Sequence, residues 1–128
     1  MKLLEQIQFD AQGLIATAIT DHLTNRLLVL CYMNREALEQ TVLENQVYVY
    51  RRSKQKTMLK GETSGHKQLV REIRLNCDEN SLEIRVEQQV GACHAGYFSC
   101  YYRHWDSETE SWIIHDQPVF EPDKVYRS

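Results

Sequence analysis

Apolar and polar side chains alternate strictly between residues 81 and 87, the period of a strand with one buried face. Residues 68–75 carry a similar apolar face, formed by Leu69, Ile73 and Leu75. The polar residues 76–80 separate the two runs, so we predict a hairpin whose turn carries Cys77. The predicted inward residues of its second strand are Leu82, Ile84 and Val86.

Two apolar runs nearer the N-terminus predict another hairpin. Residues 13–20 and 26–33 flank a turn-forming segment at 21–25. The second run is almost continuously apolar, so we expect its strand to be covered on both faces. Cys31 lies in that run and is interpreted as a core residue, because free cysteine packs like a small apolar side chain.

One segment has helical periodicity. Asn34 is a suitable cap for a helix over residues 35–44, and Asn45 is a suitable stop. The apolar face of this helix is expected to contain Ala37, Leu38, Thr41 and Val42.

The remaining segments predict short strands and loops. Residues 46–51, 97–103 and 111–115 have strand-like composition, whereas residues 52–66 are polar and predict a loop. The tail from Gln117 contains both prolines and is expected to be irregular. Together these elements predict an α+β fold, a mostly antiparallel sheet with one main helix, in a single domain over residues 1–128.

Composition narrows the class of protein. The chain is 42% apolar and 26% charged, as expected of a globular protein, and contains no apolar run of about 18 residues that would span a membrane. Its N-terminus lacks the apolar stretch of a signal peptide, so we expect a cytoplasmic protein without a membrane partner. The net charge of −3 argues against nucleic acid as a partner.

In contrast to the negative net charge of the chain, residues 51–60 form a basic segment. It has no acidic residue and suits a small anionic ligand, although a solvated loop is the alternative. Its cations are Arg51, Arg52, Lys54, Lys56 and Lys60.

The cysteine spacing suggests metal chemistry. Cys77, Cys93 and Cys100 cluster in the sequence, and His94 follows the second of them. A disulfide with a spare thiol, or three buried unligated thiols, are alternatives; we favour three thiolates binding Zn²⁺. Three protein ligands leave a fourth position for water, as in catalytic zinc sites, whereas His94 in that position would close the site. No short Cys-x₂₋₄-Cys knuckle is present, which favours the open site.

Residues 60–66 read Lys-Gly-Glu-Thr-Ser-Gly-His. Two glycines, two hydroxyls, a lysine and a histidine suit a loop that wraps an anion with backbone N–H groups and side chains. A flexible surface loop is the alternative interpretation.

These motifs resemble the phosphoribosyl-AMP cyclohydrolase family of histidine biosynthesis over roughly residues 13–103. The most specific match is the run from Lys60 to His66, together with the three-cysteine spacing. The other matching stretches are Gly13-Leu14-Ile15, Tyr32-Met33-Asn34-Arg35-Glu36-Ala37-Leu38, Cys77-Asp78, and Cys93-His94 with Cys100.

The resemblance implies an intertwined homodimer that binds Zn²⁺ through Cys77 of one chain and Cys93 and Cys100 of the other. It also implies hydrolysis of N1-(5-phosphoribosyl)-AMP, a phosphorylated nucleotide, between N1 and C6 of its purine ring. His66 and His94 are the candidates for catalytic proton transfer, with His66 preferred if a metal holds His94. The expected substrate-binding residues are Arg52, Lys54, Lys60, Glu62, Thr63 and Ser64.

The chain departs from the family pattern at the expected Mg²⁺ site. The family usually has Asp-Cys-Asp-x-Asp around the first cysteine, and this chain has Asn76, Asp78 and Asn80 there. His94 would complete this degenerate site, and we expect Mg²⁺ to bind weakly or not at all.

Other departures affect the expected substrate wall. Tyr50 and Met58 stand where the family tends to have tryptophan, Arg51 replaces serine, and Ala16 replaces proline. Two alternatives therefore accompany the cyclohydrolase prediction. One is a paralogous zinc hydrolase acting on another purine-like or cyclic amidine substrate, and the other is a non-catalytic zinc-binding protein of the same fold.

Overall fold

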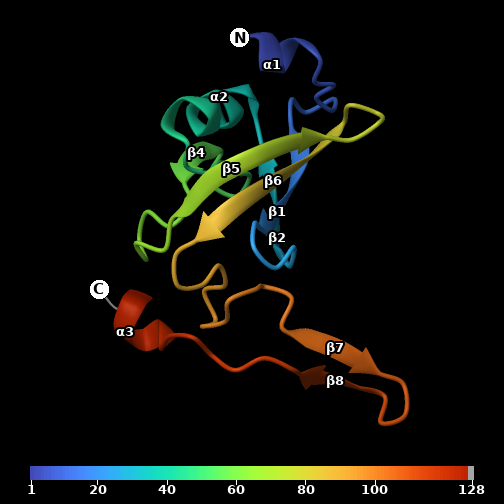
Figure 1. Ribbon diagram of the computed structural model, residues 1–128, viewed down its shortest axis with the longest axis vertical. Coiled ribbons are helices and arrows are strands. Elements are labelled where there is room, and N and C mark those ends of the chain that lie inside the picture. The colour runs from blue at the N-terminus through green and yellow to red at the C-terminus, as the bar shows by residue number, and fades with distance from the viewer. Residues whose placement is uncertain (127–128) are drawn as a thin grey trace.

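The computed structural model describes residues 1–126, and its centre is a four-stranded sheet with strand order β2-β1-β6-β5 (Figure 1). The sheet consists of β1 (Ile15–Asp21), β2 (Leu27–Met33), β5 (Gln68–Leu75) and β6 (Ser81–Gln88). Two antiparallel hairpins, β1–β2 and β5–β6, are joined by a parallel ladder between β1 and β6. The predicted α+β class with mostly antiparallel strands is confirmed, and the parallel ladder is an addition to it.

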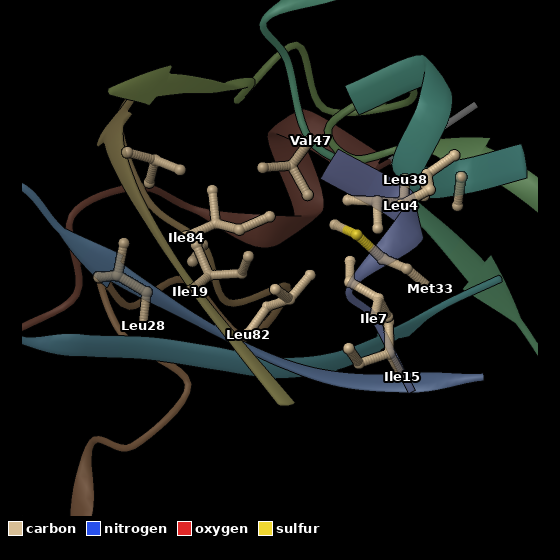
Figure 2. Packing of buried hydrophobic residues seen from close by; sticks show 13 residues of the cluster. Leu4, Ile7, Ile15, Ile19, Leu28, Met33, Leu38, Val47, Leu82 and Ile84 are labelled. Carbon is tan, nitrogen blue, oxygen red and sulfur yellow. The ribbon is translucent and has the colours of Figure 1, made fainter. Parts of the chain in front are cut away.

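The core lies between one face of this sheet and the helices α1 (Lys2–Glu5) and α2 (Arg35–Glu44). Figure 2 shows that Ile19 and Ile84 of the sheet belong to the same cluster of side chains as Leu38 and Val47. All four side chains are fully buried. Burial of each side chain contributes about 1.5–3 kcal/mol to the stability of the fold. This cluster therefore stabilises the sheet and helix that carry the loops.

Helix α2 has the predicted bounds because both of its ends are determined locally. The Asn34 side chain accepts a hydrogen bond from the Ala37 N–H at 2.8 Å, which caps the first turn. Asn45 adopts a left-handed conformation with φ of 56°, which ends the helix. Ala37, Leu38 and Thr41 are buried on its inner face, as predicted.

The β5–β6 hairpin confirms the inward positions of Leu82, Ile84 and Val86. In β5 the expected single face is wrong, because the register shifts between Val70 and Glu72. The extra residue in β5 reverses which face of the sheet the following side chains occupy. Leu69 therefore pairs with Glu87, whereas Ile73 pairs with the buried Ile84.

Strand β2 differs from the expectation of a strand covered on both faces. It lies at the edge of the sheet, and Leu30 is 51% exposed. The polar segment after it is also more regular than predicted, because β4 (Lys56–Leu59) pairs with β3 (Tyr48–Arg51) in a hairpin. Only part of the expected loop over residues 52–66 is therefore irregular.

The C-terminal part of the described chain leaves the sheet. Strands β7 (Arg103–Asp106) and β8 (Ser111–Ile114) form a separate hairpin that extends away from the core (Figure 1). The predicted strand at 97–103 is wrong for residues 97–102. The backbone there crosses β2 instead, where the Cys100 N–H donates to the Leu28 carbonyl at 2.7 Å.

The tail is also partly regular, contrary to the expectation of an irregular segment. It contains the short helix α3 (Pro122–Tyr126), and proline suits the first helical position because it has no N–H to satisfy. No helix in residues 1–126 is long and apolar enough to cross a membrane.

Candidate functional site

A cavity of about 800 Å³ opens between β2, the β3–β4 hairpin and the loop over residues 60–66. Its size lies within the range of small-molecule sites. Seven of the residues predicted for catalysis or substrate binding line it, namely Arg52, Lys60, Glu62, Thr63, Ser64, His66 and His94. Lys54 does not line the cavity and is exposed on the β3–β4 turn. The fold thus brings together residues that are far apart in the sequence, such as Arg52 and His94.

The loop over residues 60–66 is closed by internal hydrogen bonds, and Glu62, Thr63 and Gly65 are exposed in it. The Gly65 N–H donates to the Gly61 carbonyl at 2.7 Å, and the His66 N–H donates to the Ser64 hydroxyl at 3.1 Å. Gly61 has φ of +85°, and a Cβ there would lie 2.5 Å from the His66 carbonyl oxygen. Glycine is therefore required at this position for the loop to close.

Arg52 belongs to a small stacked unit on the cavity wall. Its guanidinium carbon lies 4.3 Å from the centre of the Tyr32 ring, a cation–π contact. Sequence analysis missed Tyr32 as a lining residue because no local pattern reports which way a side chain of an edge strand faces. Cys31 beside it packs against the core as predicted, yet it also lines the cavity.

The thiols of Cys93 and Cys100 form a close pair. Burial raises the pKa of the Cys100 thiol to about 11, and the charge and hydrogen bond of Cys93 add to this while Lys60 opposes it. The Ala95 N–H donates to the Cys93 sulfur at 3.4 Å. Two adjacent thiols can both ionise only if a cation neutralises them, so this pair suits a metal such as Zn²⁺.

Cys77 lies apart from this pair. It is exposed in the turn that precedes β6, whereas Cys93 follows the other end of that strand (Figure 1). A strand of eight residues is about 23 Å long between its end residues. Within residues 1–126, no three His, Cys, Asp or Glu side chains of one chain lie close enough to hold a metal ion.

The turn that carries Cys77 is held by two amides. The Asn76 side chain donates to the Asn80 side-chain oxygen at 2.7 Å. The Asn76 oxygen accepts from the N–H groups of Asn80 and Ser81, both at 2.9 Å. Asp78 lies exposed between them. Two aspartates in these places would bring two negative charges together, so the amides stabilise this turn without a cation.

The two histidines have different surroundings. His94 is exposed and lines both the main cavity and a smaller one of about 490 Å³ with Pro122, Asp123 and Tyr126. His66 is half-buried, and its Nδ1 atom is buried without a hydrogen-bond partner among residues 1–126. A buried ring nitrogen of this kind is costly unless a ligand or an ordered water supplies its partner.

Comparison with known proteins places these features in a family. The sequence profile of phosphoribosyl-AMP cyclohydrolase matches residues 29–102, which include the predicted loop and all four cysteines.

Curated relatives extend the match over nearly the whole chain. A protein of Methanosarcina barkeri named phosphoribosyl-AMP cyclohydrolase is 48% identical over 98% of this chain and 97% of its own length. Proteins of the same name from Azotobacter vinelandii and Chloroherpeton thalassium are 43% and 41% identical, each over 98% of this chain. Those matches cover 93% and 90% of the respective relatives. The chain therefore belongs to the phosphoribosyl-AMP cyclohydrolase family of hydrolases, which act on a cyclic amidine.

Proposed function

We propose that this protein hydrolyses N1-(5-phosphoribosyl)-AMP in histidine biosynthesis and that it does so with Zn²⁺ held by Cys77, Cys93 and Cys100. The observation that carries the proposal is the cavity in which the closed loop of residues 60–66 meets His94, next to the thiol pair. The names of the relatives support the same reaction.

The cavity suits a ligand with two phosphate groups. Arg52 and Lys60 supply positive charge on its wall, and the loop supplies the hydroxyls of Thr63 and Ser64. Arginine is suited to bidentate phosphate contacts, and the cation–π contact with Tyr32 holds the Arg52 guanidinium at the cavity wall. Lys54 lies outside the cavity and is omitted from the proposed substrate-binding set.

The reaction needs a water oxygen at C6 of the purine ring and a proton at N1. The C–O bond forms as the N1–C6 bond breaks, so that C6 becomes a carboxamide carbon and N1 keeps its phosphoribosyl group. When bound, Zn²⁺ lowers the pKa of a coordinated water enough to give hydroxide near neutral pH. His66 and His94 both line the cavity and are the proposed proton carriers, with His66 preferred for its unpartnered Nδ1.

The same arrangement supports a homodimer with shared sites. Because Cys77 lies at the far end of β6 from the thiol pair, one chain offers only two of the three proposed ligands together. A second copy of the chain would supply the third. The exposed apolar residues of the β7–β8 hairpin, Trp105, Trp112 and Ile114, offer a surface for such a partner.

The direct test is an assay of zinc-loaded protein with N1-(5-phosphoribosyl)-AMP, following the product by its absorbance. We expect turnover that Lys60→Ala and His66→Ala each reduce by about a hundredfold or more, since they remove charge and proton transfer respectively. Lys54→Ala is the matched control for Lys60→Ala, because Lys54 is an exposed cation outside the cavity. No turnover of this nucleotide by fully zinc-loaded native protein would contradict the proposed substrate.

A second candidate is a paralogue that uses the same zinc chemistry on another purine-like or cyclic amidine substrate. The specific observation favouring it is the Asn76–Asn80 pair, where the family usually has aspartates. Turnover of an alternative cyclic amidine, with none of N1-(5-phosphoribosyl)-AMP, would distinguish it. A non-catalytic zinc-binding protein would turn over neither.

We further expect activity to be nearly independent of added Mg²⁺. Mg²⁺ prefers carboxylate oxygens, and each lost negative charge near it removes a few kcal/mol of attraction at about 4 Å and an effective dielectric of about 20. Two amides in place of two carboxylates should weaken binding by roughly a hundredfold or more. Titration calorimetry on zinc-loaded protein checks this, with the double variant Asn76→Asp, Asn80→Asp as the comparison. Saturable stimulation of the native protein at micromolar Mg²⁺ would show that this expectation is wrong.

A further inference from the structure

The C-terminal segment 117–126, which lies beyond the residues matched by the family profile, packs directly against the site. The Val119 N–H donates to the Gly96 carbonyl at 2.8 Å, and the Phe120 N–H approaches the same oxygen at 3.4 Å. A Cβ on Gly96 would lie 2.8 Å from the Phe120 carbonyl oxygen, and one on Gly91 would lie 2.9 Å from a Val119 methyl carbon. The segment is therefore seated closer than any side chain at these glycines would allow.

This seating brings Phe120 onto His66. The two ring centres are 4.6 Å apart, and the ring planes are inclined at 81°, an edge-to-face contact. The ring centre of Tyr126 lies 6.3 Å from that of Phe120, and Tyr126 itself lines the cavity. The segment thus supplies two aromatic side chains, one in contact with the imidazole and one lining the cavity.

The backbone of His66 is fixed independently of these aromatic side chains. Its N–H donates to the Ser64 hydroxyl at 3.1 Å, and its carbonyl accepts from the Gln88 side chain at 3.4 Å. The freedom that remains is rotation of the imidazole, whose Nδ1 has no partner among residues 1–126. Among the ring–ring contacts of the described residues, only that with Phe120 involves His66. Packing against Phe120 therefore restricts the direction in which the ring nitrogens point.

We infer that Phe120 is a positioning residue, which holds the His66 imidazole in the orientation needed for proton transfer. The inference rests on the proposed role of His66 in the hydrolysis. It extends the functional unit beyond residues 29–102, because the C-terminal segment then determines the geometry of a residue in the matched region. Misplacement of a reacting group by about 1 Å can cost a hundredfold in rate, so loss of this contact should be visible in turnover.

The test compares Phe120→Ala with Phe120→Tyr, which keeps the ring, and with Gln117→Ala, which truncates an exposed side chain of the same segment. We expect Phe120→Ala to lower kcat by about 10- to 100-fold with KM changed by less than about threefold. Phe120→Tyr should restore most of kcat, and Gln117→Ala should stay near the native value. A rise in KM with kcat unchanged, or equal losses of kcat in Phe120→Ala and Gln117→Ala, would overturn the inference.

A spectroscopic measurement separates this inference from the proposed function. Phe120→Ala should shift the NMR resonances of the His66 ring protons, because the ring current of the aromatic ring 4.6 Å away is lost. The same protons in Phe120→Tyr should stay near their native shifts. This comparison remains valid if the native protein proves inactive toward N1-(5-phosphoribosyl)-AMP. Unchanged ring-proton shifts in Phe120→Ala would contradict the contact itself, whatever the substrate.

Discussion

Replacement of Cys93 with alanine is expected to remove most of the bound zinc and essentially all turnover. Cys93 is buried beside Cys100, and its sulfur accepts a hydrogen bond from the Ala95 N–H. Its thiolate is therefore a central ligand of the proposed site. Without it, only one thiolate of the pair remains, and zinc affinity falls with each lost ligand. Elemental analysis of purified protein, together with the hydrolysis assay, measures both effects.

Cys31→Ala is the matched control for this experiment. The Cys31 thiol donates to the Thr17 carbonyl at 3.5 Å and has no place in the proposed ligand set. Its replacement should leave the zinc content unchanged, whereas Cys77→Ala and Cys100→Ala should behave like Cys93→Ala. If the Cys93→Ala protein retains one equivalent of zinc, Cys93 is not a zinc ligand and the assignment is wrong.

Mixing two inactive variants, Cys77→Ala and Cys100→Ala, is expected to restore activity. If Cys77 of one chain completes the thiol pair of the other, each heterodimer contains one intact site and one doubly defective site. With random exchange of subunits, recovery should approach about one quarter of the native activity. The measurement is the hydrolysis assay after exchange, with heterodimer formation verified by mass spectrometry.

The control for complementation mixes Cys93→Ala with Cys100→Ala. These residues lie together in one chain, so no heterodimer of this pair contains an intact site and activity should stay absent. Recovery in both mixtures would indicate an artefact of exchange. If neither mixture recovers although heterodimers have formed, the three ligands do not come from two subunits.

Much of the fold could be predicted because it depends on local signals. Helix α2 begins and ends where two asparagines dictate, and the inward residues of β6 follow from strict alternation. The errors arise where a distant partner decides. Residues 56–59 are strand only because β3 pairs with them, and the face of Leu69 changes because the register shifts after Val70.

In the candidate site, too, features set by local sequence could be predicted and features set by distant packing could not. The motif over residues 60–66 and the separate motif with His94 identify cavity residues from sequence alone, because each forms a compact local structure. Sequence could not indicate that Tyr32, Phe120 and Tyr126 border the site, because their places depend on tertiary packing. Nor could it reveal how far Cys77 lies from the thiol pair, because the extended strand β6 intervenes.

The parallel ladder between β1 and β6 has a consequence for biosynthesis of the chain. It pairs Ala16 with Ser81 and Asp21 with Val86, so the strand that completes the sheet is encoded long after the first hairpin. Closing a loop of roughly 60 residues costs about 3.6 kcal/mol of chain entropy, beyond a constant, against about 1.5 kcal/mol for a loop of five or six. Until residue 86 has left the ribosome, β1 lacks its central neighbour and Ile19 has no Ile84 against which to pack. For most of its synthesis the nascent polypeptide therefore carries an incomplete apolar face, which is an exposure that chaperones recognise.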